Sequence, residues 1–173
     1  GIQDTEQKHF LTTWPGMSSP KSRMFFNNIC RAIGQMTPVR YLEVGTWAGS
    51  TLLSFLYNQT NVQYASAVDN FTQFQGDFNV KDMLVNGIKH FLPGTAIETH
   101  LGDKFELNID VPVPHLPENY RFQFLESHCF ELDKTRLFGN YNVYFFDGPH
   151  AYEDTKKGFE YYNDHLDNIF VVI

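Results

Sequence analysis

The sequence is poor in cysteine and has no run of basic residues. Among 173 residues only Cys30 and Cys129 are cysteines, and no CxxC pair occurs. Two distant cysteines make neither a disulfide framework nor a cysteine metal site, so a reducing, cytoplasmic setting is expected. Thirteen Lys and Arg stand against 20 Asp and Glu, a formal net charge of -7. A surface that reads nucleic acid usually carries a basic patch, so nucleic acid is not an expected partner.

Long apolar runs are absent as well. No stretch could span a bilayer and no signal peptide is recognisable, so a membrane is not an expected partner either. Hydrophobic residues nevertheless make up 42% of the chain, with 17 Phe and 9 Tyr. That composition provides a packed core rather than a disordered chain, and the length suits one domain.

Apolar residues recur at helical spacing in some segments and form short continuous runs in others. Ser19-Pro20 is typical of a helix start, because a capping hydroxyl precedes a proline at the first helical position. The alternation predicts an α/β fold, a Rossmann-like open parallel sheet with helices on both faces. Strands are expected at 39–44, 62–70, 120–130, 141–148 and 168–173, with helices at 20–34, 48–58, 80–92 and 153–166.

Two segments interrupt this alternation. Residues 1–19 are polar and rich in turn formers, so we expect an N-terminal arm before a domain that covers 20–173. The proline-rich stretch 94–119 is expected to be an insertion with a short hairpin. Because "GDKFEL" resembles "SHCFEL", the earlier copy remains an alternative third strand. The later copy is preferred because it stands closer to "YNVYFFDG".

Four polar residues lie at or just beyond the ends of expected strands: Glu43, Asp69, His128 and Asp147. In an open parallel sheet, ligands bind outside the carboxyl ends of the strands. One aspartate there is often only a turn former. Four polar residues from four strands favour a functional site at this edge.

The first turn, "EVGTWAG", has two glycines separated by three residues. Gly45 would permit a tight turn, and Gly49 would let the backbone approach a ligand. The GxGxxG pattern of dinucleotide sites is absent, and no lysine completes a P-loop. Asp69, 26 residues after Glu43, could accept hydrogen bonds from ribose hydroxyls, or it could simply cap a helix.

The stretch "FFDGPHAYED" places Asp147 at a strand end and His150 three residues later. A carboxylate is a hard oxygen ligand that suits Mg²⁺, and a neighbouring imidazole can act as general base near neutral pH. A capped turn with a surface histidine is the plainer alternative.

Together these motifs resemble the class I S-adenosylmethionine-dependent methyltransferases. "LEVGTWAGST" is similar to their first motif, E/DxGxxxG, "AVDN" to the second and "YFFDGPHAYED" to the fourth. The last is similar to the small-molecule O-methyltransferase branch, which includes macrocin O-methyltransferase-like and cephalosporin hydroxylase-like proteins. The resemblance runs from Pro20 to Ile173 apart from the insertion, and implies a chain without the last two strands of that fold.

The resemblance implies methyl transfer from S-adenosylmethionine to a hydroxyl of a small molecule, in a chain that could form a homo-oligomer. His150 would be the general base, and Asp147 would hold Mg²⁺ if a metal assists. A module that binds the cofactor or a nucleoside without catalysis is the alternative. An acceptor pocket could draw on the N-terminal arm and the 94–119 insertion, where Trp14 and Met17, together with Trp47, could line it or simply pack in the core. The implied cofactor contacts are Glu43, Gly45, Thr46 and Gly49 at the methionine end, Asp69 at the ribose, and Asn70, Phe71, Ser127 and His128 around the adenine, where the family usually has Asp in place of His128.

Overall fold

The computed structural model describes residues 9, 11–72, 79–91, 98–101, 105–109 and 121–172. Within them, seven strands form one sheet in the order β3-β4-β5-β2-β1-β6-β7. The strands are β1 (Val39–Val44), β2 (Val62–Asp69), β3 (Glu98–Leu101), β4 (Phe105–Ile109), β5 (Arg121–Glu126), β6 (Tyr141–Phe146) and β7 (Leu166–Val172). The helices are α2 (Pro20–Gly34), α3 (Ser50–Leu56), α4 (Val80–Phe91) and α5 (Tyr152–Tyr162), with 3₁₀ turns η1 (Lys134–Arg136) and η2 (Asn163–His165).

Five of these strands are parallel, which confirms the predicted Rossmann-like sheet. β1 pairs with β2 and with β6, and β5 and β7 add to the two sides. β5 pairs parallel with β2, so the preferred later segment does supply the third parallel strand, although "SHCFEL" itself follows β5 at 127–132. The earlier copy, "GDKFEL", overlaps β4. β3 and β4 form an antiparallel hairpin that extends the sheet beyond β5. The rest of the expected insertion at 94–119 lies outside the described residues.

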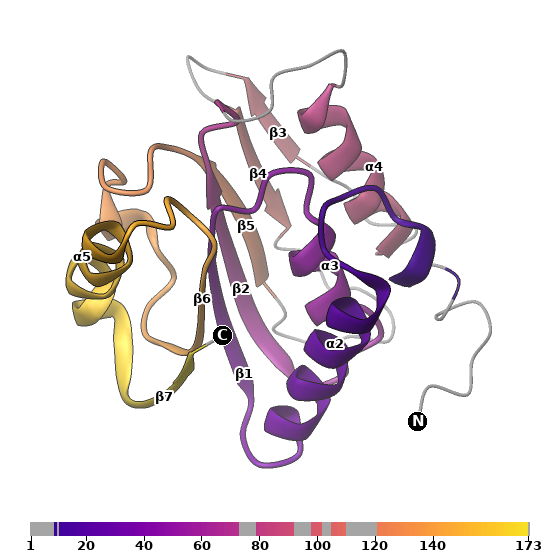
Figure 1. Cartoon of the computed structure of the whole chain (residues 1–173), viewed down its shortest axis with the longest axis horizontal. Coiled ribbons are helices and arrows are strands. Elements are labelled where there is room, and N and C mark those ends of the chain that lie inside the picture. The colour runs from indigo at the N-terminus through magenta and orange to yellow at the C-terminus, as the bar shows by residue number, and fades with distance from the viewer. Residues whose placement is uncertain are drawn as a thin grey trace.

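Helices cover both faces of the sheet (Figure 1). α2, α3 and α4 lie on one face and α5 on the other, so each central strand is buried on both sides. Successive residues of β1 show the alternation: Tyr41 belongs to the core under α2 and α3, and Leu42 to the core under α5. This double burial explains why the strands read as nearly continuous apolar runs.

Helix α2 begins where its sequence predicts. The Oγ of Ser19 accepts a hydrogen bond from the backbone N–H of Ser22 at 3.1 Å, and Pro20 occupies the first helical position. The proline lacks an N–H at a place where none is needed, and the serine satisfies one of the unpaired donors of the first turn.

Gly87 lies inside α4, where glycine lowers helix propensity. Its place is explained by packing: a Cβ there would stand 2.3 Å from Cδ1 of Leu53 and 2.6 Å from the ring of Trp14. The absent side chain therefore lets α4 pack closely against α3 and the N-terminal segment.

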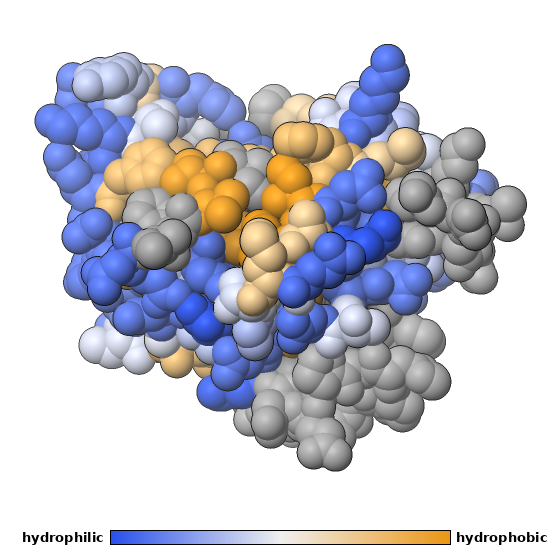
Figure 2. Space-filling model, turned by 90° about the horizontal axis from the view of Figure 1, so that it is seen from below, coloured by the Kyte–Doolittle hydropathy of each residue, from blue (hydrophilic) through white to orange (hydrophobic). Residues whose placement is uncertain are grey.

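Apolar side chains also reach the surface. Figure 2 shows apolar residues gathered in the middle of one face, with hydrophilic residues around them. None of the described helices combines the length and apolar character that a bilayer span requires. The large apolar side chains that are exposed among the described residues are Met17, Phe25, Met36, Tyr152, Val171 and Val172.

Candidate functional site

A pocket opens at the carboxyl ends of the parallel strands, where the strand order changes direction. From β1 the chain first adds β2 and β5 on one side, and then β6 and β7 on the other. Such a switch point leaves a crevice between the turns that follow the strands. Backbone hydrogen bonds tie these turns together: Gly45 N–H donates to Val68 O, and Asp147 N–H donates to Val44 O, both at 2.8 Å.

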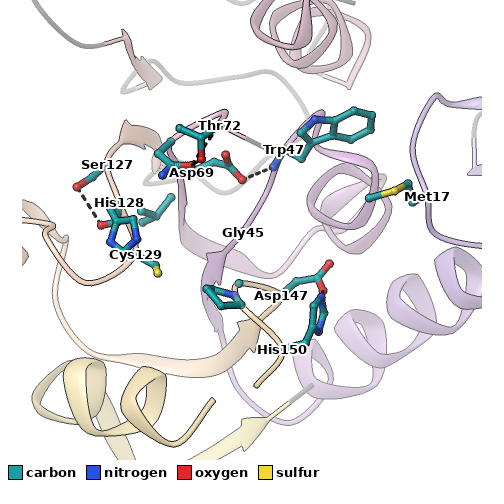
Figure 3. A pocket seen from close by; sticks show the side chains of 14 residues that line it. Met17, Gly45, Trp47, Asp69, Thr72, Ser127, His128, Cys129, Asp147 and His150 are labelled. Atoms are coloured by element: carbon teal, nitrogen blue, oxygen red, sulfur yellow. Dashed lines mark hydrogen bonds and ion pairs between the residues drawn. The ribbon is translucent and has the colours of Figure 1, made fainter. Parts of the chain in front are cut away.

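The pocket has a volume of about 270 Å³. It takes one turn from each of four strands, as Figure 3 shows. Seven of the predicted site residues line it: Gly45, Asp69, Asn70, Ser127, His128, Asp147 and His150. The sequence therefore predicted correctly that the ends of β1, β2, β5 and β6 meet at one place.

Asp69 ends β2, and two backbone donors fix its carboxylate. Its Oδ2 accepts the N–H of Trp47 at 2.7 Å, and its Oδ1 accepts the N–H of Phe71 at 2.6 Å. Burial raises the pKa of Asp69 above its ordinary value, and these two hydrogen bonds and that of Asn70 oppose the rise. A carboxylate has about four lone-pair sites, more than these three donors occupy, so Asp69 can still accept from a ligand hydroxyl.

Asp147 and His150 form the opposite side of the pocket. Nε2 of His150 lies 3.7 Å from Oδ1 of Asp147, with 83% and 44% of the two side chains exposed. This distance is too long for a hydrogen bond but close enough for attraction once the imidazole is protonated. The pKa of Asp147 is raised mainly by burial. The nearby His150 opposes that rise, and the charge of Asp69 adds to it.

The turn after β5 contributes Ser127 and His128. Ser127 N–H donates to the carbonyl oxygen of Asp69 at 3.0 Å, which joins this turn to the end of β2. Nδ1 of His128 accepts the N–H of Phe130 at 3.3 Å, and the two rings meet edge to face. These contacts hold the imidazole at the pocket wall (Figure 3).

Glu43 does not lie in the pocket, although the sequence predicted it there. Its side chain is fully buried under α3, where it accepts O–H hydrogen bonds from Tyr41 at 2.5 Å and Thr51 at 2.8 Å. Burial raises the pKa of Glu43 to about 8, against the two hydroxyl donors. In this structure the carboxyl ties β1 to α3 behind the pocket wall.

Thr46, Gly49 and Phe71 also lie outside the pocket lining. Gly49 has a φ of +82°, and a Cβ on it would stand 2.7 Å from Cδ1 of Leu84. Packing against α4 therefore accounts for this glycine without a ligand. Gly45 does border the pocket, but a Cβ on it would meet the backbone oxygen of Asp147 at 2.2 Å. Both glycines of the first motif are thus required by close contacts within the protein.

Some lining residues were not predicted as site residues. Cys129 follows His128 directly and keeps a free thiol. Its position after a strand end was a usable signal. Met17 and Trp47 were named only as possible lining residues of an acceptor pocket, and both do line this pocket. The remaining lining residues, which were not predicted, are Val68, Thr72, Gly148 and Pro149.

The residues around Asp147 do not fit a magnesium site. Across the part of the chain that the structure describes, no group of three or more His, Cys, Asp or Glu could hold a metal ion. Mg²⁺ needs several oxygen ligands in octahedral geometry, and Asp147 brings one carboxylate next to one imidazole. The predicted metal contact of Asp147 therefore lacks partners among the described residues.

No protein-family model and no curated protein matches this sequence. Solved structures do match. An O-methyltransferase from Bacillus cereus, in complex with S-adenosylhomocysteine, aligns with a TM-score of 0.58 and 11% identity over 99% of this chain and 66% of that chain. The S-adenosylhomocysteine-bound methyltransferase PaMTH1 of Podospora anserina gives 0.59 and 16% over 99% and 62%. The TDP-rhamnose 3′-O-methyltransferase CalS11 of calicheamicin biosynthesis gives 0.54 and 15% over 99% and 77%.

These likenesses concern the fold, because sequence identity is low throughout. The chain spans slightly less than two thirds of the length of the first two proteins. Almost all of it aligns, so the five parallel strands and their helices have counterparts in those structures. The resemblance read from the motifs and the likeness of the structures agree: this chain has the Rossmann-like fold of class I S-adenosylmethionine-dependent O-methyltransferases.

Proposed function

We propose that this chain binds S-adenosylmethionine in the pocket and transfers its methyl group to a hydroxyl of a small molecule. The charge of the pocket carries this proposal. Asp69 and Asp147 line it, and no Lys or Arg is among the described residues that do. S-adenosylmethionine bears a sulfonium, an ammonium and two ribose hydroxyls, all of which suit carboxylates. A nucleotide that binds through its phosphates would instead need cations or a helix N-terminus.

The arrangement of donors and acceptors fits the cofactor. Asp69 would accept the ribose hydroxyls, since its carboxylate keeps acceptor capacity beyond its backbone donors. Ser127 and His128 would border the adenine, because they lie near Asp69 on the β2 and β5 side of the pocket (Figure 3). Asn70, which directly follows Asp69 and also lines the pocket, would border it too. Gly45 and Asp147 would then face the cationic methionine end.

His150 is the proposed general base. When bound, the cofactor supplies an electrophilic methyl group on a sulfonium. The residues of the chain hold the acceptor hydroxyl in line with that methyl group and remove its proton. His150 would take this proton, and Asp147 at 3.7 Å would stabilise the resulting imidazolium. No step is assigned to a metal ion.

Calorimetry with S-adenosylhomocysteine tests the shared first step. We expect binding by the native chain and its loss in Asp69→Ala. Methyl transfer from S-adenosylmethionine to a panel of polyols, sugars and phenols tests the second step. A binding module without catalysis would pass the first test and fail the second. A chain that does not bind S-adenosylhomocysteine would contradict both readings.

A further inference from the structure

Residues 11–18, here called the strap, lead from the core of the protein to the pocket. Leu11 is fully buried in the core under α2 and α3. Trp14 packs against the same core beside Gly87 of α4. Met17 lines the pocket with 68% of its surface exposed. In Figure 3, Met17 approaches from the side of α2, away from Ser127 and His128.

A single side chain, Arg23 of α2, holds the strap along most of its length. Its Nε donates to Oγ of Ser18 at 2.9 Å, and its Nη2 donates to the carbonyl of Gly16 at 3.1 Å. Its Nη1 donates to the carbonyl of Leu11 at 3.3 Å and also to that of Trp14. One guanidinium thus binds four residues of the strap.

Arg23 is only 3% exposed, and within the described part of the chain no carboxylate forms an ion pair with it. Burial lowers its pKa from the ordinary value, but an arginine stays charged at neutral pH. Its charge is therefore balanced by the strap carbonyls and one hydroxyl. Because a buried charge is costly without such partners, Arg23 and the strap depend on each other.

The strap also fits closely against the first turn of α3. Oγ of Ser18 lies 3.1 Å from Oγ of Ser50. Gly16 has a φ of +146°, and a Cβ there would come within 2.3 Å of Cβ of Ser50. A displaced strap would lose these contacts together with the four donated by Arg23.

We propose that Arg23 is a positioning residue of the candidate site: by fixing the strap, it sets Met17 as the wall that closes the pocket at the end where Asp147 and His150 lie. This inference rests on the proposed function for the identity of the ligand. It predicts that Arg23, which does not line the pocket, controls affinity for the methionine end of the cofactor and leaves the adenosine end unchanged.

The test compares Arg23→Lys with Lys21→Met, a control that removes an exposed cation from the same helix. Lysine keeps the charge but offers its donors at one point, so it cannot reach four separated acceptors. Hydrogen exchange of strap amides should rise by about tenfold in Arg23→Lys, while exchange in β1 stays constant. Arg23→Met is the stronger variant, and if it does not fold, Arg23→Lys still decides the question.

Two probes then separate the ends of the pocket: S-adenosylhomocysteine, and 5′-methylthioadenosine, which lacks the amino-acid end. For Arg23→Lys we expect Kd for the first to rise by about fivefold or more and Kd for the second to change by less than about twofold. Met17→Ala should reproduce this difference while strap exchange remains native.

Strap exchange equal to that of Lys21→Met would overturn the proposal. So would an equal loss of affinity for both probes, because general loosening would explain it. A native chain that binds neither probe would contradict the proposed function, and the exchange comparison would still support or overturn the hold of Arg23 on the strap.

Discussion

The carboxylate of Asp69 accepts the backbone N–H groups of Trp47 and Phe71, and both of these residues have a left-handed backbone. Their φ angles are +45° and +55°. For residues with bulky side chains this conformation costs on the order of 1–3 kcal/mol each, and it persists only where the surroundings enforce it. Asp69 therefore shapes the turns after β1 and β2 in addition to facing the pocket.

Asp69→Asn is expected to weaken both stability and ligand binding. An amide has one acceptor oxygen, and its NH₂ group would face one of the two backbone donors. The free energy of unfolding should fall by about 1–3 kcal/mol, the cost of an unsatisfied buried donor. Kd for S-adenosylhomocysteine should rise by about tenfold or more, as expected for the loss of a charge-assisted hydrogen bond. Denaturant unfolding and calorimetry measure the two effects.

Asp133→Asn is the matched control for this change. Asp133 also accepts a backbone N–H, that of Thr135 at 3.1 Å, but it lies at an exposed turn away from the pocket. Its variant should keep native affinity. If Asp69→Asn bound S-adenosylhomocysteine as the native chain does, the ribose role of Asp69 would be wrong.

Ligand affinity should fall on acidification at a higher pH than an ordinary aspartate would cause. Burial raises the pKa of Asp69, so its charge is lost as the pH falls through that raised value. The ionised form is the better acceptor for hydroxyls. Affinity for S-adenosylhomocysteine should thus be full at neutral pH and decline below it. Asp69→Asn and Asp147→Asn, measured over the same pH range, show which carboxylate causes the decline, and a flat native profile would contradict this prediction.

The sheet and the meeting of its strand ends could be predicted because both follow from local patterns. Short apolar runs identified the five parallel strands, and a polar residue ended each of four of them. Parallel strands must bring those ends to one edge, whatever the details of packing. The boundary after α5 was less accurate. That helix ends at Tyr162, and β7 starts at Leu166 after a 3₁₀ turn.

The direction of a side chain at a strand end was harder to predict from the sequence. Glu43 shares its face of β1 with Tyr41, two residues earlier, and this face lies under α3 rather than toward the pocket. Gly49 was expected to face a ligand because of its place in the "EVGTWAG" turn, and its packing role could not be foreseen because its partner, Leu84, is 35 residues away. The position of Met17 at the pocket follows from the hydrogen bonds between Arg23 and the strap. These are tertiary contacts, which no local sequence pattern indicates.

His150→Ala should abolish methyl transfer and leave binding of S-adenosylhomocysteine nearly unchanged. The imidazole is the proposed proton acceptor, and its side chain is mostly exposed, so its removal should disturb little else. General bases typically contribute about 10²–10⁴-fold to rate. Turnover with an acceptor from the panel, at saturating S-adenosylmethionine, measures the loss. His165→Ala, which removes a histidine from η2, is the control and should keep native turnover. Turnover that persists in His150→Ala would refute the base assignment.

Glu43→Gln should change the pH dependence of stability. The folded pKa of about 8 lies above the unfolded value, so the folded chain holds a proton that the unfolded chain has released. The contribution of Glu43 to the free energy of unfolding is fully present below the ordinary glutamate pKa and is lost as the pH rises toward 8. The loss is roughly 1.4 kcal/mol per pH unit in that window. Glutamine stays neutral, so the stability of Glu43→Gln relative to the native chain should improve from pH 5 to pH 8. If denaturant unfolding gave the native chain and Glu43→Gln parallel curves of unfolding free energy against pH, Glu43 would be ionised in the folded state.

Gly49→Ala should destabilise the fold and spare the pocket. Alanine at a φ of +82° is strained, and its Cβ would press on the buried Leu84. Strain of this kind costs about 1–2 kcal/mol, and the displaced leucine adds to it. Gly34→Ala is the matched control, because its nearest non-local neighbour would be 3.5 Å away and α2 favours alanine over glycine. Thermal unfolding should therefore separate the two variants, while the folded fraction of each binds S-adenosylhomocysteine normally. If Gly49→Ala instead kept native stability but no longer bound S-adenosylhomocysteine, Gly49 would contact the ligand. Packing against Leu84 would then not explain why this position needs glycine.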